Sequence, residues 1–418
     1  MLAGAWHRTI GTFLAHPLTE TSDVPLSPVA MASIAATIVL LVGLLWPSRG
    51  GPPEAGARGR ASPADPWAGR LTTGQVATRA VGVVLLVLAV AAGRAGSASE
   101  LENIAPALIV GMAWPGLVLA SSLLGAVWRW VDPIDSLARL TARGDRRGDP
   151  PGEPVDVRPA LVSALAWTWY LSAYTGTLAP RSVGAAAGLY AVAMLAAALA
   201  FGRTVALPAA EVFGILAGWL ARFRRGVLAS AWQPPVGTEV VLGTVAGGLL
   251  FGTVRRSELW GALNVRPRAG LLAAAGILAF ALAGALALVW LRRWATRLGD
   301  PGSVAGAAIP AVGGVALAVA MAFNRLTTSA QLLVILASDP FGRGWDLFGT
   351  ADWPRPPEPA PLGTAGLDLA QVAVLLAGGL AGALVLARRT PPAGRYPGAA
   401  ATALLTGAGV MAVTVTAS

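Results

Sequence analysis

The segment from residue 338 to residue 352 holds most of the side chains in this sequence that could bind a ligand. It reads Ser-Asp-Pro-Phe-Gly-Arg-Gly-Trp-Asp-Leu-Phe-Gly-Thr-Ala-Asp. Gly and Pro allow tight turns, and an Asp side chain can accept hydrogen bonds from the backbone of its own turn. A purely connecting loop needs no aromatic side chains, so we expect either an ordered cap over helix ends or a binding surface. The candidate binding residues are Asp339, Arg343, Trp345, Asp346 and Asp352.

Two polar residues outside this loop join the candidate set. Asn103 opens an apolar segment, and Arg325 interrupts the apolar run 303–337. As one helix this run would be about 50 Å long, more than a bilayer crossing requires. We expect Arg325 either to extend its charge to the membrane surface or to lie under the 338–352 loop, paired with Asp339 or Asp346.

A metal site is a weaker alternative. The chain has no Cys and only two His, which excludes disulfides, thiol catalysis and sites with three His ligands. His16 and Asp23, with other carboxylates on the same predicted side, could hold a divalent cation through mainly oxygen ligands. No phosphate loop, dinucleotide fingerprint or nucleophile elbow is present, so the sequence names no cofactor.

Composition indicates a membrane protein. Hydrophobic residues make up 55% of the 418 residues and charged residues only 12%, about half the share of charge in a soluble domain. All 31 basic residues are Arg. In a membrane protein such charge lies mostly in loops that contact lipid headgroups, so we expect membrane lipid and no nucleic acid among the partners.

The apolar segments predict an all-α, polytopic integral membrane bundle with about ten transmembrane helices and one short interfacial helix. The expected spans are 28–46, 74–93, 104–127, 159–177, 183–201, 238–254, 269–291, 303–323, 367–387 and 397–416. Residues 208–220 are too few to cross and should lie at the inner surface. Residues 1–27 form an extracytoplasmic segment, 28–418 a single membrane domain, and 338–366 an extracytoplasmic loop.

The distribution of Arg predicts the orientation. With both termini outside the plasma membrane, the cytoplasmic segments hold 21 Arg and 11 acids, against 9 Arg and 10 acids outside. This asymmetry follows the positive-inside rule. The outer loop 255–268 carries four Arg against the trend. If 208–220 crossed, every later segment would be inverted.

Several smaller predictions concern packing near the inner surface. Gly recurs at four-residue spacing in the pairs 214/218, 243/247, 302/306 and 378/382, which favours close helix contacts. Arg79 lies inside an apolar segment, and we expect its side chain to reach the inner interface. Glu211 and Glu239 are predicted to be interfacial as well.

Several blocks of the sequence resemble a family of polytopic actinobacterial membrane proteins labelled fenitrothion hydrolase-like. The blocks are His16-Pro17 with Asp23-Val24-Pro25, Asn103-Ile104-Ala105-Pro106, Gly125-Ala126-Val127-Trp128-Arg129 with Pro133, and residues 338–352. The resemblance covers most of the chain, and its most specific block is 338–352. It implies hydrolysis of organophosphate esters. Members of the family carry His in the helix before the last block, where this sequence has Gly306 and Ala320.

Three functions follow as hypotheses. The first is a non-catalytic subunit or scaffold whose extracytoplasmic surface at 338–352 binds a ligand or a partner membrane or extracytoplasmic protein. Concentrated Trp, Phe, Arg and Asp without a catalytic constellation favour it. The second is a membrane-bound, metal-dependent hydrolase of phosphotriester-like substrates. The third is a small-solute transporter, which the scarcity of ionisable residues within the predicted spans disfavours.

Overall fold

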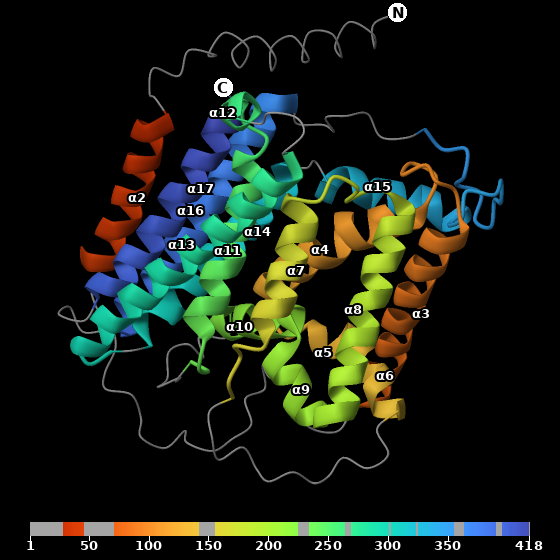
Figure 1. The fold of residues 1–418 in the computed structure, drawn as a ribbon, viewed down its shortest axis with the longest axis horizontal. Helices are drawn as coiled ribbons and strands as arrows, with labels where there is room; N and C mark the ends of the chain where they lie inside the picture. The colour runs from red at the N-terminus through yellow and green to blue at the C-terminus, as the bar shows by residue number, and fades with distance from the viewer. Residues whose placement is uncertain are drawn as a thin grey trace, which may run out of the picture.

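Helices make up the part of the chain that the structure describes. This structure is a computed structural model and describes residues 28–45, 71–141, 155–224, 234–263, 269–300, 302–322, 325–354, 363–389 and 395–417. Over these residues the sole extended pairing is an isolated bridge between Asp156 and Val236. The predicted all-α fold is therefore confirmed (Figure 1).

The helices follow the predicted apolar segments closely. In chain order they are α2 (Pro28–Leu45), α3 (Thr73–Ala95), η1 (Pro106–Ala113), α4 (Trp114–Leu124), α5 (Trp128–Val131), α6 (Pro133–Thr141), α7 (Ala160–Ser172), α8 (Pro180–Phe201), α9 (Arg203–Ala210), α10 (Val212–Arg224), α11 (Thr238–Val254), α12 (Glu258–Leu263), α13 (Ala269–Arg297), α14 (Ser303–Ala322), α15 (Arg325–Ser338), α16 (Gly363–Arg389) and α17 (Tyr396–Ala417). η1 is a π-helix that runs directly into α4. Each of the predicted spans thus coincides with helical structure.

Fewer helices meet the requirements for a membrane crossing than the sequence predicted. Among the described residues, six helices are long and apolar enough, or seven if α9 and α10 form one bent span. α7 has 13 residues and α11 has 17, about 20 and 25 Å at 1.5 Å per residue, against a hydrocarbon core of about 30 Å. Length and composition therefore support several crossings but not the predicted ten.

The predicted interfacial helix at 208–220 is wrong in both its ends and its place. The chain breaks at Glu211, and α9 and α10 meet there at a bend of 76°. The Glu211 carboxylate accepts hydrogen bonds from the first backbone N–H groups of α10, which starts a new helix at this point. α10 is apolar on most of its surface and is buried among α4, α7 and α14 rather than lying at a surface.

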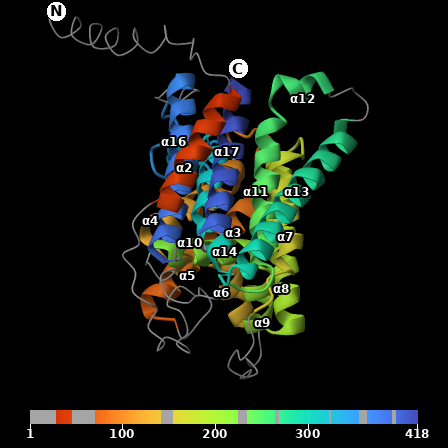
Figure 2. The same cartoon turned by 90° about the vertical axis from the view of Figure 1, so that its left-hand side faces the viewer.

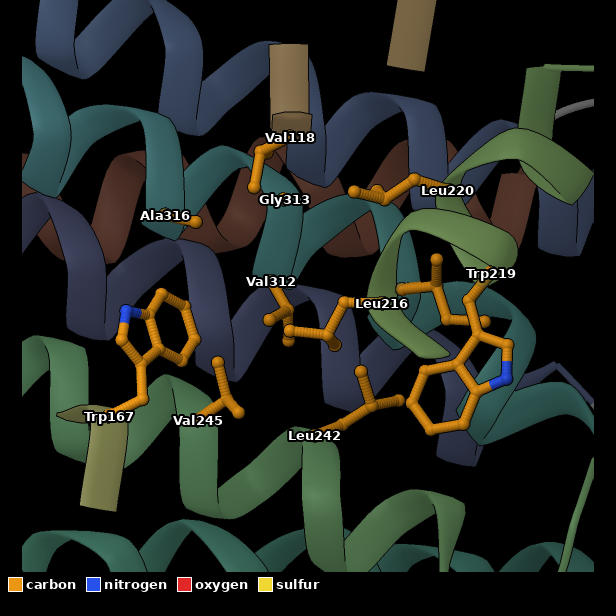
Figure 3. Close-up of a pocket in the computed structure, with 11 residues that line it drawn as sticks. Val118, Trp167, Leu216, Trp219, Leu220, Leu242, Val245, Val312, Gly313 and Ala316 are labelled. Carbon is orange, nitrogen blue, oxygen red and sulfur yellow. The ribbon is translucent and has the colours of Figure 1, made fainter. Parts of the chain in front are cut away.

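Aromatic side chains and a small cavity mark the centre of the fold around α10. Trp167 of α7 makes edge contacts with Trp114 and Phe213, at ring-centroid distances of 5.4 and 5.1 Å. Beside them, Trp219 of α10 and neighbouring side chains from α4, α7, α11 and α14 line a cavity of about 20 Å³ (Figure 3). Every lining residue is apolar, and the space is close to that of a single water molecule. It is a packing gap.

Close helix contacts occur where the Gly spacing predicted them. α2, α16 and α17 lie side by side, with α14 packed against α16 and α17 (Figure 2). A side-chain carbon added at Gly378 of α16 would lie 2.7 Å from the carbonyl oxygen of Pro310 in α14. One added at Gly243 of α11 would lie 2.4 Å from the carbonyl oxygen of Gly284 in α13. Gly306 was also predicted to make a close contact but does not, because a carbon added there meets nothing within 4 Å.

Gly378→Ala should therefore weaken the contact between α14 and α16. The added methyl group meets backbone atoms that cannot rotate away, and overpacking of this kind costs about 1–3 kcal/mol. Thermal unfolding of the detergent-purified protein should show a lower Tm. Gly306→Ala on α14 is the matched control and should leave Tm unchanged or slightly higher. Equal Tm values for the two variants would contradict the close approach of the helices.

Candidate functional site

Residues 338–354 form a loop that is fastened to the turn between α3 and η1. The carbonyl oxygen of Phe341 accepts a hydrogen bond from Ser97 N at 2.7 Å, and that of Pro340 accepts one from Ile104 N at 3.1 Å. Gly342 has a φ of +66°, and a side-chain carbon there would lie 2.7 Å from the carbonyl oxygen of Glu102. Only Gly fits such a contact in this conformation. The loop is thus an ordered cap.

The predicted acidic residues of the loop hold its own turns. Asp339 accepts hydrogen bonds from Arg343 N at 2.9 Å and from Gly344 N at 2.6 Å. Asp346 accepts one from Ala351 N at 3.1 Å. Asp352 is exposed at the end of the loop. The carboxylates of Asp339 and Asp346 therefore have a structural task in the described conformation.

Arg343 links the loop to the end of α3. Its guanidinium donates a hydrogen bond to the carbonyl oxygen of Ala95, the last residue of α3, at 3.0 Å. The same group lies over the rings of Phe341 and Trp345, 5.3 and 5.9 Å from their centroids. A cation near carbonyl groups at a helix C-terminus is favourable, and so is a cation over an aromatic face. Arg343 therefore fixes the position of Trp345.

Asn103 supports the loop from below. Its side chain is fully buried, and its Nδ2 donates to the carbonyl oxygens of Ala92 and Ser97 at 2.8 and 2.9 Å. Its Oδ1 accepts from Ala105 N at 3.0 Å. The structure thus places Asn103 in the turn beneath the loop, away from the outer surface of the cap.

Three predicted site residues lie wholly or partly outside the described residues. His16 and Asp23, the metal-site alternative, lie outside the described residues. Arg325 is the first residue of α15, and its side chain also lies outside the description. Its predicted pairing with Asp339 or Asp346 stays a prediction.

Large apolar side chains cover the outside of the cap. The exposed fractions are 40% for Trp345, 62% for Leu347, 70% for Phe348 and 54% for Trp353. We call these four side chains the apolar face of the loop. The hydrogen bonds of the loop run within its own turns and to the helices and turn beneath it. The cap therefore presents mainly apolar surface outward, which is typical of a protein or membrane contact.

Ser338 holds the second half of the loop in place. It is fully buried, and its Oγ accepts hydrogen bonds from Phe348 N at 3.0 Å and Thr350 N at 3.2 Å. Its Oγ also lies 2.8 Å from Thr350 Oγ1, which donates to the carbonyl oxygen of Val334. One hydroxyl group thus ties the end of α15 to the apolar face of the loop.

A second polar site, at the opposite end of the molecule, was not predicted. Asp135 of α6 is fully buried and accepts hydrogen bonds from Arg79 of α3, Arg139 of α6 and Arg203 of α9. The bonds from Arg139 and Arg203 are both 2.8 Å long. Arg79 also donates to the carbonyl oxygen of Arg129, at 2.8 Å. We call this the α6-end cluster.

The structure buries three charged residues that were predicted to lie near the membrane interface. Arg79 does not reach a membrane surface, because its residue is only 1% exposed. Glu211 and Glu239 are buried within protein, and Glu239 pairs with Arg292 at 2.8 Å. Their place near the membrane interface stays a prediction. The sequence did contain a signal, since Asp135 and Arg139 have helical i,i+4 spacing and Arg79 interrupts an apolar segment. Nothing in their spacing along the chain indicated that these segments meet.

The electrostatics of Asp135 follow from its neighbours. Burial raises the pKa of its carboxyl, but hydrogen bonds from Arg139 and Arg79 lower it more, and the resulting pKa lies below the usual range. Asp135 therefore remains ionised at neutral pH. Its stabilising effect is present above the pKa of an unfolded Asp, about 4, and is lost as the pH falls through the lower folded-state value.

Comparison with known proteins gives no relative from which to transfer a site. No protein-family model matches the chain, and no similar curated protein or solved structure is found. The two sites must therefore be judged by their own geometry.

Ser338→Ala should release the loop without unfolding the helices. The backbone N–H groups of Phe348 and Thr350 would lose their shared acceptor, and an unsatisfied buried group costs about 1–3 kcal/mol. Trypsin should then cleave after Arg343 faster than in the wild type, as measured by mass spectrometry of the fragments. Ser182→Ala, on α8, removes a hydroxyl outside the loop and should leave this rate unchanged. An unchanged rate in Ser338→Ala would contradict the anchoring role.

Asp135→Asn should destabilise the whole helical domain. Removing one partner from a buried ion cluster leaves uncompensated charge, at a cost of about 3–5 kcal/mol. The Tm at pH 7 should fall accordingly, and the acid sensitivity that Asp135 contributes should disappear. Asp156→Asn breaks an ion pair with the exposed Arg158 and serves as control, with no measurable change expected. Similar Tm values for the two variants would exclude a structural role for the α6-end cluster.

Proposed function

We propose that this protein is a multi-pass plasma-membrane protein with about ten crossings and with both termini outside. The Arg asymmetry of the sequence supports this orientation. The short length of α11 does not argue against it, since nearly all of α11 is buried within protein. A segment surrounded by other helices has its polar ends satisfied by protein, so it need not match the full bilayer thickness. Figure 1 is consistent with two opposite ends, one with α12 and the other with α6 and α9.

We further propose that the protein is a non-catalytic subunit or scaffold and that the apolar face of the loop docks a partner protein outside the membrane. One observation carries this proposal: the loop is held rigidly by hydrogen bonds while four large apolar side chains point outward. A rigid aromatic surface loses little conformational entropy on binding, and Trp is enriched among residues that dominate interface energies.

The charged residues of the loop favour docking over hydrolysis. Asp339 and Asp346 already accept backbone hydrogen bonds, so they are occupied in the described conformation. Within the described ranges, no group of three His, Asp or Glu side chains is arranged to hold a metal. The hydrolase alternative, which rests on His16, Asp23 and the family resemblance, stays a prediction for which the described residues add no support.

Site-specific crosslinking tests the docking proposal. A photoreactive phenylalanine analogue at position 348 should crosslink to one defined protein in native membranes, identified by mass spectrometry. Trp345→Ala should reduce this crosslink at least tenfold, because it removes a neighbouring apolar contact without altering membrane insertion. The measurement is the yield of crosslinked product per inserted protein.

The same analogue at position 189 provides the matched control. Leu189 is 72% exposed on α8, where we expect lipid, so it should give no protein crosslink. Crosslinks from position 348 to lipid alone would show that the apolar face inserts into the membrane surface instead. An unchanged protein crosslink after Trp345→Ala would also contradict the docking surface.

A further inference from the structure

The carboxyl group of Asp132 lies beside the α6-end cluster, and one of its oxygens has no hydrogen-bond partner among the described residues. Asp132 is the residue between α5 and α6 and is fully buried. Its Oδ1 accepts hydrogen bonds from the backbone N–H groups of Ile134 and Asp135, both at 2.9 Å. Its Oδ2 is buried and has no hydrogen-bond partner among the described residues. An ionised oxygen in that position would be costly, because nothing replaces its hydration.

Glu211, between α9 and α10, differs from Asp132 because both of its carboxyl oxygens accept hydrogen bonds. Its Oε1 accepts hydrogen bonds from the hydroxyl of Tyr190 at 2.5 Å and from Phe213 N at 3.2 Å. Its Oε2 accepts one from Gly214 N at 2.6 Å. Both oxygens thus act as acceptors, which is the bonding pattern of an ionised carboxylate. The two neighbouring acids thus differ in hydrogen bonding. Burial raises the pKa of Glu211 to about 7, although the hydrogen bonds from Tyr190, Gly214 and Phe213 oppose this rise.

The guanidinium groups of the cluster do not supply the missing partner of Asp132 Oδ2. The three that form ion pairs with an acid here bind Asp135. The charged and titratable groups around Asp132 are Arg79 of α3, Arg129 of α5, Asp135 and Arg139 of α6, Tyr190 of α8, Arg203 of α9 and Glu211 between α9 and α10. Among Asp132, Asp135 and Glu211, Asp132 therefore differs in one respect. Its Oδ2 has no cationic or hydrogen-bonding partner among the described residues.

We propose that Asp132 is a proton-binding site, holding a proton on Oδ2 at neutral pH beside the ionised Asp135 and the hydrogen-bonded carboxyl group of Glu211. Release breaks the O–H bond, passes the proton to water and leaves a carboxylate, so the cluster gains one negative charge. That charge repels Glu211, which lies at the 76° bend between α9 and α10. Proton release at Asp132 is thereby coupled to the contact between α6 and this bend.

The electrostatics of Asp132 support the assignment. Burial raises the pKa of its carboxyl well above the usual range, and the charges of Glu211 and Asp135 raise it further. The backbone N–H of Asp135 and the charge of Arg79 oppose this rise but do not cancel it. This inference is independent of the docking proposal.

The pH dependence of stability has a definite sign. Because the folded-state pKa of Asp132 lies above the unfolded value of about 4, folding binds a proton. The resulting stability is complete below pH 4 and declines as the pH rises toward the folded-state pKa. Asp135, whose pKa is lowered, acts in the opposite direction and only in acid.

Infrared spectroscopy of the full-length protein tests the proposal directly. At pH 7 the wild type should show the C=O stretching band of a protonated carboxyl, and this band should be absent from Asp132→Asn. Asp156→Asn removes an exposed carboxyl and should leave the band intact. Identical carbonyl regions for the wild type and Asp132→Asn would overturn the proposal.

Glu211→Gln keeps the test decisive if Asp132→Asn fails to fold. Removing the charge of Glu211 should lower the pKa of Asp132, so the band should disappear at a lower pH than in the wild type. Loss of the band at every pH would assign the proton to Glu211 and contradict the proposal. In thermal unfolding, Tm should decline less steeply with rising pH in Asp132→Asn than in the wild type. An equal decline in the two proteins would contradict the proposal.

Discussion

The ion cluster around Asp135 is the interaction on which the α6 end of the molecule depends. One fully buried carboxylate binds guanidinium groups from α3, α6 and α9, which lie up to 68 residues from Asp135 in the chain. In a chain with only 12% charged residues, such a concentration of charge is not an incidental surface feature. Burying these charges is tolerable only because they are paired, which makes the position of α6 sensitive to each member.

The two ends of the molecule satisfy their buried polar groups in different ways. At the α6 end, charges are buried and paired, and Asp132 and Glu211 lie beside them with different hydrogen bonding. At the other end, the 338–354 loop uses Asp339, Ser338 and Arg343 to satisfy backbone groups and places its aromatic side chains outside. The first arrangement suits a group that changes charge, and the second suits a contact surface. The two proposals therefore concern different parts of the protein.

The candidate site was only partly predictable. Residues 338–352 could be selected because Gly, Pro, Asp and aromatic residues are rare together in this chain. The sequence could not predict which of these residues face outward. Their orientation depends on the turn beneath the loop, where Asn103 is buried. The α6-end cluster was missed because Arg79 looked like an ordinary interfacial charge and Asp135 was not singled out at all. Their pairing depends on how α3, α6 and the α9–α10 bend come together.

By itself the sequence determined the helical class and the positions of the long apolar helices, because long apolar segments bounded by Gly, Pro and Arg leave few alternatives. It also located the close helix contacts at Gly243 and Gly378, since small residues at four-residue spacing permit them. Only the tertiary structure decided the bend at Glu211, the burial of α10 and the partners of Asp135. Those features arise from contacts between distant segments, and the local periodicity of hydrophobic residues carries no information about them.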